Sequence, residues 1–168
     1  MKLVDRFCIA CAFAFGCGLS PIMPGTVGSL PGLALGAGIR LLADQMPESA
    51  PWAWRPALIL VLLLVATAFA WWTIDRTEKT LGIHDDQRIV IDEVVGQAIA
   101  VAFVPLTWQW YLAGFVLFRL FDMWKPSLIG KIDRDVPGAA GTLGDDLLAG
   151  VVAAVLLALA RQVAPVLS

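Results

Sequence analysis

The chain has 168 residues, of which 59% are hydrophobic and 15% charged, and its formal net charge is −2. Soluble domains average roughly half apolar and about a quarter charged residues, so this composition excludes an ordinary soluble protein and indicates a membrane protein. The negative charge argues against nucleic acid as the main partner, because binding to a phosphate backbone needs a basic surface. The length suits a single domain, which we expect to span residues 1–168.

Apolar stretches follow one another along the chain and predict an all-α, polytopic membrane bundle with short or re-entrant helices. They cover residues 7–19, 30–39, 57–74, 94–118 and 147–160. The firmest span is 57–74, because its eighteen residues lack any charge and about 20 are needed to cross a hydrocarbon core. In the first stretch, Cys8, Cys11 and Cys17 are interpreted as small apolar helix residues, because no second ligand pair at zinc-site spacing accompanies them.

Charges collect at the ends of these stretches, in blocks at 75–93, 119–135 and 145–146. The stretch 94–118 would be about 37 Å long as one helix, which is too short for two full spans. A single crossing would put the first two blocks on opposite faces of the membrane. Because proline removes a backbone donor and disfavours helix at the preceding residue, Pro105 predicts a short helical hairpin that turns near 105–107. All three blocks then share one face.

The basic residues give this topology an orientation. Nine of the twelve share the face of the acids, namely Lys2, Arg6, Arg76, Lys79, Arg88, Arg119, Lys125, Lys131 and Arg134. The excess of Lys and Arg on the inner side of membrane proteins makes that face cytoplasmic.

The first and the last of these blocks place acids directly beside apolar sequence, where a charge is costly. Asp92 and Glu93 run directly into apolar sequence, and such residues suggest function by default. Gly96, four residues after Asp92, leaves room for a partner helix or a ligand. In the next block, Arg119, Asp122 and Lys125 would form one stripe on a helix, although a solvated row of ion pairs would look the same.

The last block, Asp145 and Asp146, lies where a glycine-rich loop is expected to become a helix. Helix capping would explain one aspartate there, and two less readily. The blocks together supply five acids from three separate helices: Asp92, Glu93, Asp122, Asp145 and Asp146. Oxygen-only ligands suit Mg²⁺, which could polarise a phosphoryl oxygen and activate a water for in-line attack. One or two such ions are possible.

An uncharged loop at 20–29 offers hydroxyl and backbone N–H groups that could cradle a phosphate, from Ser20, Gly25, Thr26, Gly28 and Ser29. A proline and glycine turn that caps a helix explains this loop equally well. The loop lacks the lysine and the spacing of a P-loop, so nucleotide binding is not favoured. The only histidine, His84, could act as a phosphohistidine nucleophile, but a solvated loop residue is the more usual reading and covalent catalysis is not favoured.

Four ordered blocks, at 18–29, 89–96, 118–126 and 141–150, resemble the phosphatidylglycerophosphatase A family, over roughly residues 14 to 152. The resemblance implies a magnesium-dependent enzyme of the bacterial inner membrane that hydrolyses phosphatidylglycerophosphate to phosphatidylglycerol and phosphate in phospholipid biosynthesis. It implies a metal-binding role for the five acids above and a phosphate-binding role for Arg119 and Lys125. Among the acids, Asp92, Glu93, Asp122 and Asp146 are also expected to be catalytic, and how they divide the catalytic work is left open.

Two other functions remain in view. A small cation-coupled transporter or channel would place acids near the middle of a span, whereas here every acid lies at the end of an apolar stretch. A lipid-modifying transferase is less well supported, because the Asp-Gly-(x)2-Ala-Arg signature of the alcohol phosphotransferases is absent from the sequence.

Overall fold

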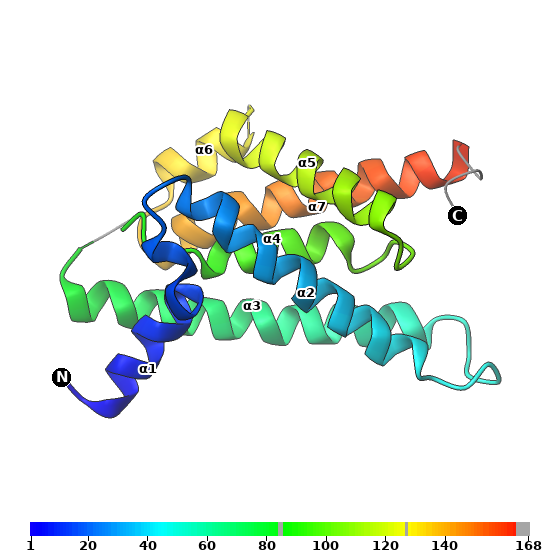
Figure 1. The fold of residues 1–168 in the computed structure, drawn as a ribbon, viewed down its shortest axis with the longest axis horizontal. Coiled ribbons are helices and arrows are strands. Elements are labelled where there is room, and N and C mark those ends of the chain that lie inside the picture. Colours follow the sequence, from blue (N-terminus) through cyan, green and yellow to red (C-terminus); the bar gives the residue numbers. More distant parts are fainter. Residues whose placement is uncertain (84–85, 127, 164–168) are drawn as a thin grey trace.

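The computed structural model describes residues 1–83, 86–126 and 128–163, and the regular secondary structure of these residues is all helical (Figure 1). In chain order the elements are α1 (Leu3–Ala12), the 3₁₀ segment η1 (Ala14–Leu19), α2 (Pro24–Asp44), α3 (Trp54–Leu81), α4 (Ile91–Val101), α5 (Trp108–Trp124), α6 (Leu128–Asp135) and α7 (Ala139–Val163). Helices α2, α3 and α7 are long and apolar enough to cross a membrane. The predicted all-α membrane bundle is confirmed.

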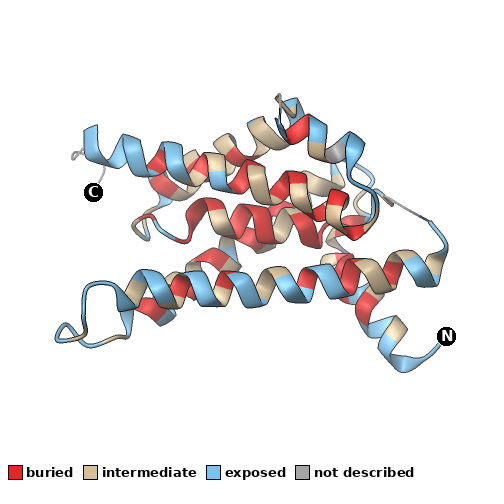
Figure 2. Ribbon diagram, turned by 180° about the vertical axis from the view of Figure 1, so that it is seen from behind, coloured by how far each residue is buried: buried red, intermediate tan, exposed pale blue. Residues whose placement is uncertain are grey.

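The short helix α4 forms the centre of the bundle. It packs against α2, α3, α5 and α7, and eight of its eleven residues are buried, in contrast to the exposed outer face of α3 (Figure 2). Its apolar residues therefore pack against protein, while α3 offers leucine and valine to lipid. A charged residue at the start of α4 is consequently held inside the bundle and away from the lipid tails.

Glycines allow the helices to approach α4 closely. A Cβ on Gly32 of α2 would lie 2.5 Å from the carbonyl oxygen of Val94, and one on Gly36 would lie 2.6 Å from Val101 Cγ2. On the other side, a Cβ on Gly150 of α7 would collide with the carbonyl oxygen of Gly96. Small residues at helix contacts are typical of membrane bundles. The two glycines that follow the acids by four residues thus pack against each other.

The predicted hairpin is present. Helix α4 ends at Val101, α5 begins at Trp108, and Pro105 lies in the turn between them. The C-terminal ends of α3 and α5 and the N-terminal ends of α2, α4 and α7 consequently lie at the same end of the bundle (Figure 1). We refer to it below as the acidic end.

Two expectations about helix starts are wrong. The segment after Pro24 was expected to be a loop, but α2 begins at this proline, a residue pre-organised for the first turn of a helix. Likewise α7 begins at Ala139, directly after Gly138 at φ 71°, so Asp145 and Asp146 lie inside the helix rather than at its cap. Packing against α4 and α6 overrides the poor helix propensity of these glycine-rich segments.

The three cysteines fit their predicted interpretation. Cys8 and Cys11 are buried in α1, Cys17 is half-buried, and all three are free thiols.

Candidate active site

A cavity of about 380 Å³ opens at the acidic end, between the start of α2 and helices α4, α5 and α7. All five predicted acids line it, together with Arg119 and Lys125. These residues are separated by up to 54 positions along the chain, from Asp92 to Asp146. The hairpin at Pro105 and the packing of α7 on α4 bring them together.

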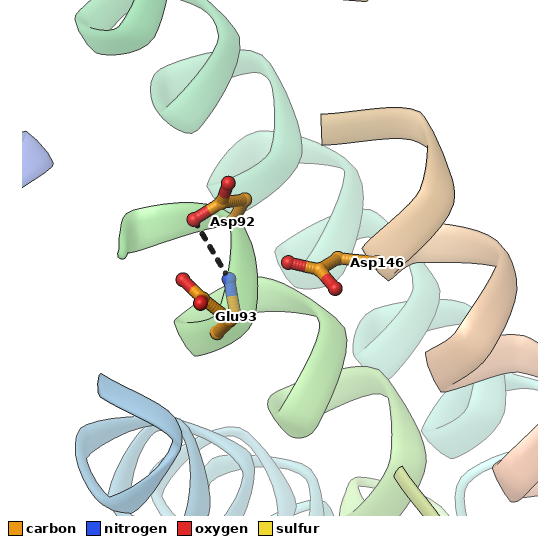
Figure 3. Close-up of side chains that lie close together, drawn as sticks. All are labelled: Asp92, Glu93 and Asp146. Atoms are coloured by element: carbon orange, nitrogen blue, oxygen red, sulfur yellow. Dashed lines mark hydrogen bonds between the residues drawn. The ribbon is translucent and has the colours of Figure 1, made fainter. Parts of the chain in front are cut away.

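Helix α4 contributes the adjacent acids Asp92 and Glu93 in its first turn. Asp92 is only 6% exposed. The backbone N–H of Glu93 donates a hydrogen bond of 3.0 Å to Asp92 Oδ1, which fixes the carboxylate at the helix start (Figure 3). Acidic groups are favoured at a helix N-terminus by the backbone dipole, so the position of both residues is compatible with a charged form.

Asp146 of α7 is the residue that links the acids. Its carboxylate points toward Asp92 and Glu93 (Figure 3). One oxygen from each of these three residues lies within 4.8 Å of the others. Asp146 also belongs to a second such group with Asp122 and Asp145, at the same limit of 4.8 Å. Two neighbouring carboxylate clusters therefore share one aspartate.

Two cations of α5 border the acids. Arg119 forms an ion pair with Asp122, one helical turn further along, and both side chains are 13% exposed. Lys125 ends α5 in a left-handed conformation, at φ 44°, and its Nζ lies 2.7 Å from Asp145 Oδ2. The first pair lies within α5, and the second ties the end of α5 to α7.

The site holds more negative than positive charge, because six carboxylates line it, the five predicted acids and Asp86, against two cations. Burial of uncompensated carboxylates is costly, so protons or bound cations must offset the excess. Within the described part of the chain, Glu93 Oε2 and Asp146 Oδ1 are buried and have no hydrogen-bond partner. Buried carboxylate oxygens without hydrogen-bond partners, next to clusters of further carboxylates, are suitable ligands for a hard divalent cation such as Mg²⁺.

The structure brings two further residues into the site: Gly25, which belongs to the loop predicted to cradle a phosphate, and Asp86, which was not predicted as a site residue. Gly25 lines the cavity at the start of α2, and a Cβ there would collide with Glu93 Oε1 and lie 3.1 Å from Arg119 Nη1. Asp86 lines it too, and its side-chain hydrogen bond with Arg88 holds its pKa below the ordinary value, against the opposing effect of burial. The only sequence signal for Asp86 is its place inside the charged block at 75–93.

The predicted phosphate cradle is not assembled as expected. The Ser29 hydroxyl is buried and donates to the carbonyl oxygen of Gly25, and Gly28 is packed against Val90. Ser20 donates to the carbonyl oxygen of Ile22. These three residues and Thr26 are not among the described residues that line the cavity. His84 lies outside the described residues.

Comparison with known proteins identifies the family. The profile of the family described as Phosphatidylglycerophosphatase A matches residues 10–161. A protein of Escherichia coli (strain K12) named phosphatidylglycerophosphatase A is 39% identical over 147 residues, which cover 87% of this chain and 78% of that protein. The protein of that name from Haemophilus influenzae is 35% identical over 87% of this chain and 83% of its own length.

A further relative carries a different name. A protein of Bacteroides thetaiotaomicron, named provisionally as a phosphatidylinositol-3-phosphatase, is 38% identical over 89% of this chain and 90% of its own length. No solved structure matches the chain.

Proposed function

Because the chain belongs to the phosphatidylglycerophosphatase A family of lipid phosphatases, we propose that it hydrolyses phosphatidylglycerophosphate to phosphatidylglycerol and phosphate. The reaction takes place in the cavity at the acidic end and depends on Mg²⁺. The observation that carries this proposal is the pair of carboxylate clusters that share Asp146, beside two cations that can receive a phosphate.

The five acids Asp92, Glu93, Asp122, Asp145 and Asp146 are the residues that would hold Mg²⁺. Bound there, the metal would polarise a phosphoryl oxygen and make a water more nucleophilic at neutral pH. The excess of buried carboxylates supports this role, and so do the oxygens of Glu93 and Asp146 that have no partner among the described residues, because a cation would offset the charge and satisfy the oxygens together.

The protein's own groups position the substrate. Lys125 and Arg119 lie at the edge of the acids, where they can pair with phosphate oxygens and offset the negative charge that develops in the transition state. Gly25 brings the N-terminus of α2 to the same cavity, and the dipole of that helix favours an anion. Ion pairs with Asp122 and Asp145 hold both cations in place before a substrate arrives.

The gathering of these acids at one end of the bundle supports an enzyme rather than a transporter, whose ion path would need polar residues along a span. We further propose that the chain lies in the bacterial inner membrane with the acidic end in the cytoplasm. The basic residues support this orientation, because only Arg40, Arg55 and Arg161 lie toward the end of the bundle opposite the acids.

The test is phosphate release by the purified chain in detergent. With Mg²⁺, phosphatidylglycerophosphate should be hydrolysed, and excess chelator should remove the activity until Mg²⁺ is restored. Phosphatidylinositol 3-phosphate is the competing substrate, in view of the name of the Bacteroides relative. A higher kcat/KM on that lipid would overturn the proposed substrate, and activity indifferent to chelation would overturn the metal dependence.

A further inference from the structure

We propose that an acyl chain of the lipid substrate lies along the outer face of α5, in an apolar groove that starts at the edge of the acidic cavity. This inference rests on the proposed function. The groove, called the α5 groove below, has a volume of about 470 Å³ and is lined by Phe115, Val116, Arg119, Leu120, Met123 and Trp124. Its occupant would be the hydrocarbon tail of the molecule whose phosphate enters the cavity.

The first argument is continuity, because two residues line both spaces. Arg119 and Met123 belong to the wall of the acidic cavity and to the wall of the α5 groove. The guanidinium of Arg119 pairs with Asp122 inside the cavity. Its aliphatic stem can face apolar surface, as is usual for arginine. A ligand with a charged head and an apolar tail can therefore cross this boundary without exposing either part to the wrong surroundings.

The second argument is depth in the membrane. Trp124, at the end of α5 near the acids, is 71% exposed, and exposed tryptophans favour the level of the lipid headgroups. Leu120 and Val116 follow one and two turns deeper, so the groove descends about 12 Å from the interface toward the hydrocarbon. A phospholipid has the same polarity, with its phosphate at the surface and its chains below. The groove is therefore aligned as the substrate would be.

A second apolar groove, on another face of the bundle, does not reach the site. It has a volume of about 550 Å³ between α3 and α7, with Leu64 and Val155 among its walls, and it shares none of the described residues that line the acidic cavity. Its wall residue next to Asp146 is Leu147, which packs against the buried cluster that contains Val95 and Leu143. That groove ends on packed side chains and serves here as a control surface.

The test compares two forms of phosphatidylglycerophosphate, one with two long chains and one with two short chains that dissolves as a monomer. Val116→Trp fills the α5 groove, and Val155→Trp places the same residue in the control groove; the two valines are 55% and 53% exposed. The measured quantity is the ratio of kcat/KM for the long-chain lipid to that for the short-chain lipid. A variant with less folded protein loses both rates together, so misfolding does not change this ratio.

We expect Val116→Trp to lower the ratio about tenfold, as for lost burial of about two methylene groups, and Val155→Trp to leave it at the wild-type value. An unchanged ratio in Val116→Trp, or an equal fall in Val155→Trp, would overturn the proposal. If wild-type protein hydrolyses neither lipid, the proposed function fails and the groove with it. If it hydrolyses both and the ratio is insensitive to Val116→Trp, only the groove fails.

Discussion

At the scale of single residues, Asp146 is the acid that joins the two halves of the candidate site. It belongs to both carboxylate clusters, and one of its oxygens has no hydrogen-bond partner among the described residues. We expect Asp146→Asn to lower kcat/KM on phosphatidylglycerophosphate by about 10³-fold, the size of effect seen when one preorganised group is lost from an active site. The measurement is steady-state phosphate release in detergent with saturating Mg²⁺.

The same variant has a second readout that does not need catalysis. Removal of one negative charge from a crowded, buried cluster relieves repulsion, so Asp146→Asn should unfold at a higher temperature than wild type in the presence of chelator. Mg²⁺ should then raise the melting temperature of wild type more than that of the variant. The control is Asp75→Asn, an acid on α3 paired with Lys79 away from the cavity, which should leave both quantities unchanged. Activity above a tenth of wild type in Asp146→Asn would contradict the central role of this residue.

At the scale of elements, the contact between α2 and α4 depends on the absence of a side chain at particular glycines. Gly36 and Gly38 lie on the same helix, but a Cβ at Gly36 would lie 2.6 Å from Val101 Cγ2, while one at Gly38 would meet nothing within 4 Å. Gly36→Ala should therefore destabilise the protein by about 1–3 kcal/mol through overpacking. Gly38→Ala should be neutral or stabilise it by up to about 1 kcal/mol, because alanine favours helix.

Thermal unfolding of both variants in the same detergent checks this prediction. The comparison is informative because both variants carry the same substitution, on the same helix and at a similar depth in the membrane. Only the surroundings of the added methyl group differ. Equal melting temperatures for the two variants would mean that α2 does not approach α4 as closely as described. Because α4 carries Asp92 and Glu93, we also expect Gly36→Ala to lower activity and Gly38→Ala to preserve it.

Sequence patterns predicted the elements well where one strong local signal decided the outcome. Pro105 sits in a 25-residue apolar stretch, and its backbone chemistry alone indicated the turn that puts the acids at one end. The starts of α2 and α7 were missed because glycine-rich sequence favours a loop locally. Packing between residues far apart in the chain, such as the contacts of Gly28 with Val90 and of Gly150 with Gly96, favours helix in these parts of the chain instead.

The site was predictable to the extent that its residues are charged. Asp92, Glu93, Asp145 and Asp146 stood out because charges beside apolar sequence need a reason. The spacing of Arg119, Asp122 and Lys125 was equally compatible with solvated ion pairs, and the phosphate-binding role of the two cations came from the family resemblance. Ser29 is not among the described residues that line the cavity, and its hydroxyl donates to the carbonyl oxygen of Gly25 one turn earlier, a contact that sequence alone does not reveal. Gly25 belongs to the predicted cradle loop and lines the cavity, but its close approach to Glu93 is a contact that only the structure shows.

At the scale of the whole molecule, exposed tryptophans indicate where the membrane lies. On α3, Trp54 and Trp72 are both exposed and lie about 27 Å apart along the helix, close to the thickness of a hydrocarbon core. On α5, Trp108 and Trp124 lie about 24 Å apart in the same way. Since tryptophan favours the two interfaces, the acidic cavity is expected at headgroup depth, near Trp72 and Trp124, where a lipid phosphate resides.

The orientation of this bundle can be tested with two reporter cysteines in a chain whose Cys8, Cys11 and Cys17 are replaced by alanine. Glu48→Cys lies in the loop between α2 and α3, and Lys79→Cys lies at the other end of α3, near the acids; both positions are exposed. If the acidic end faces the cytoplasm, a membrane-impermeant maleimide should label Glu48→Cys in intact spheroplasts and Lys79→Cys only after lysis. The reverse pattern would place the cavity outside the cell and contradict the orientation drawn from the basic residues. Labelling of both in intact spheroplasts would show that α3 does not span the membrane. Both reporters flank one helix, so the labelling pattern depends only on the direction in which α3 crosses the membrane. Because the other helices pack with α3 in one bundle, that direction also determines the side of the membrane on which the cavity lies.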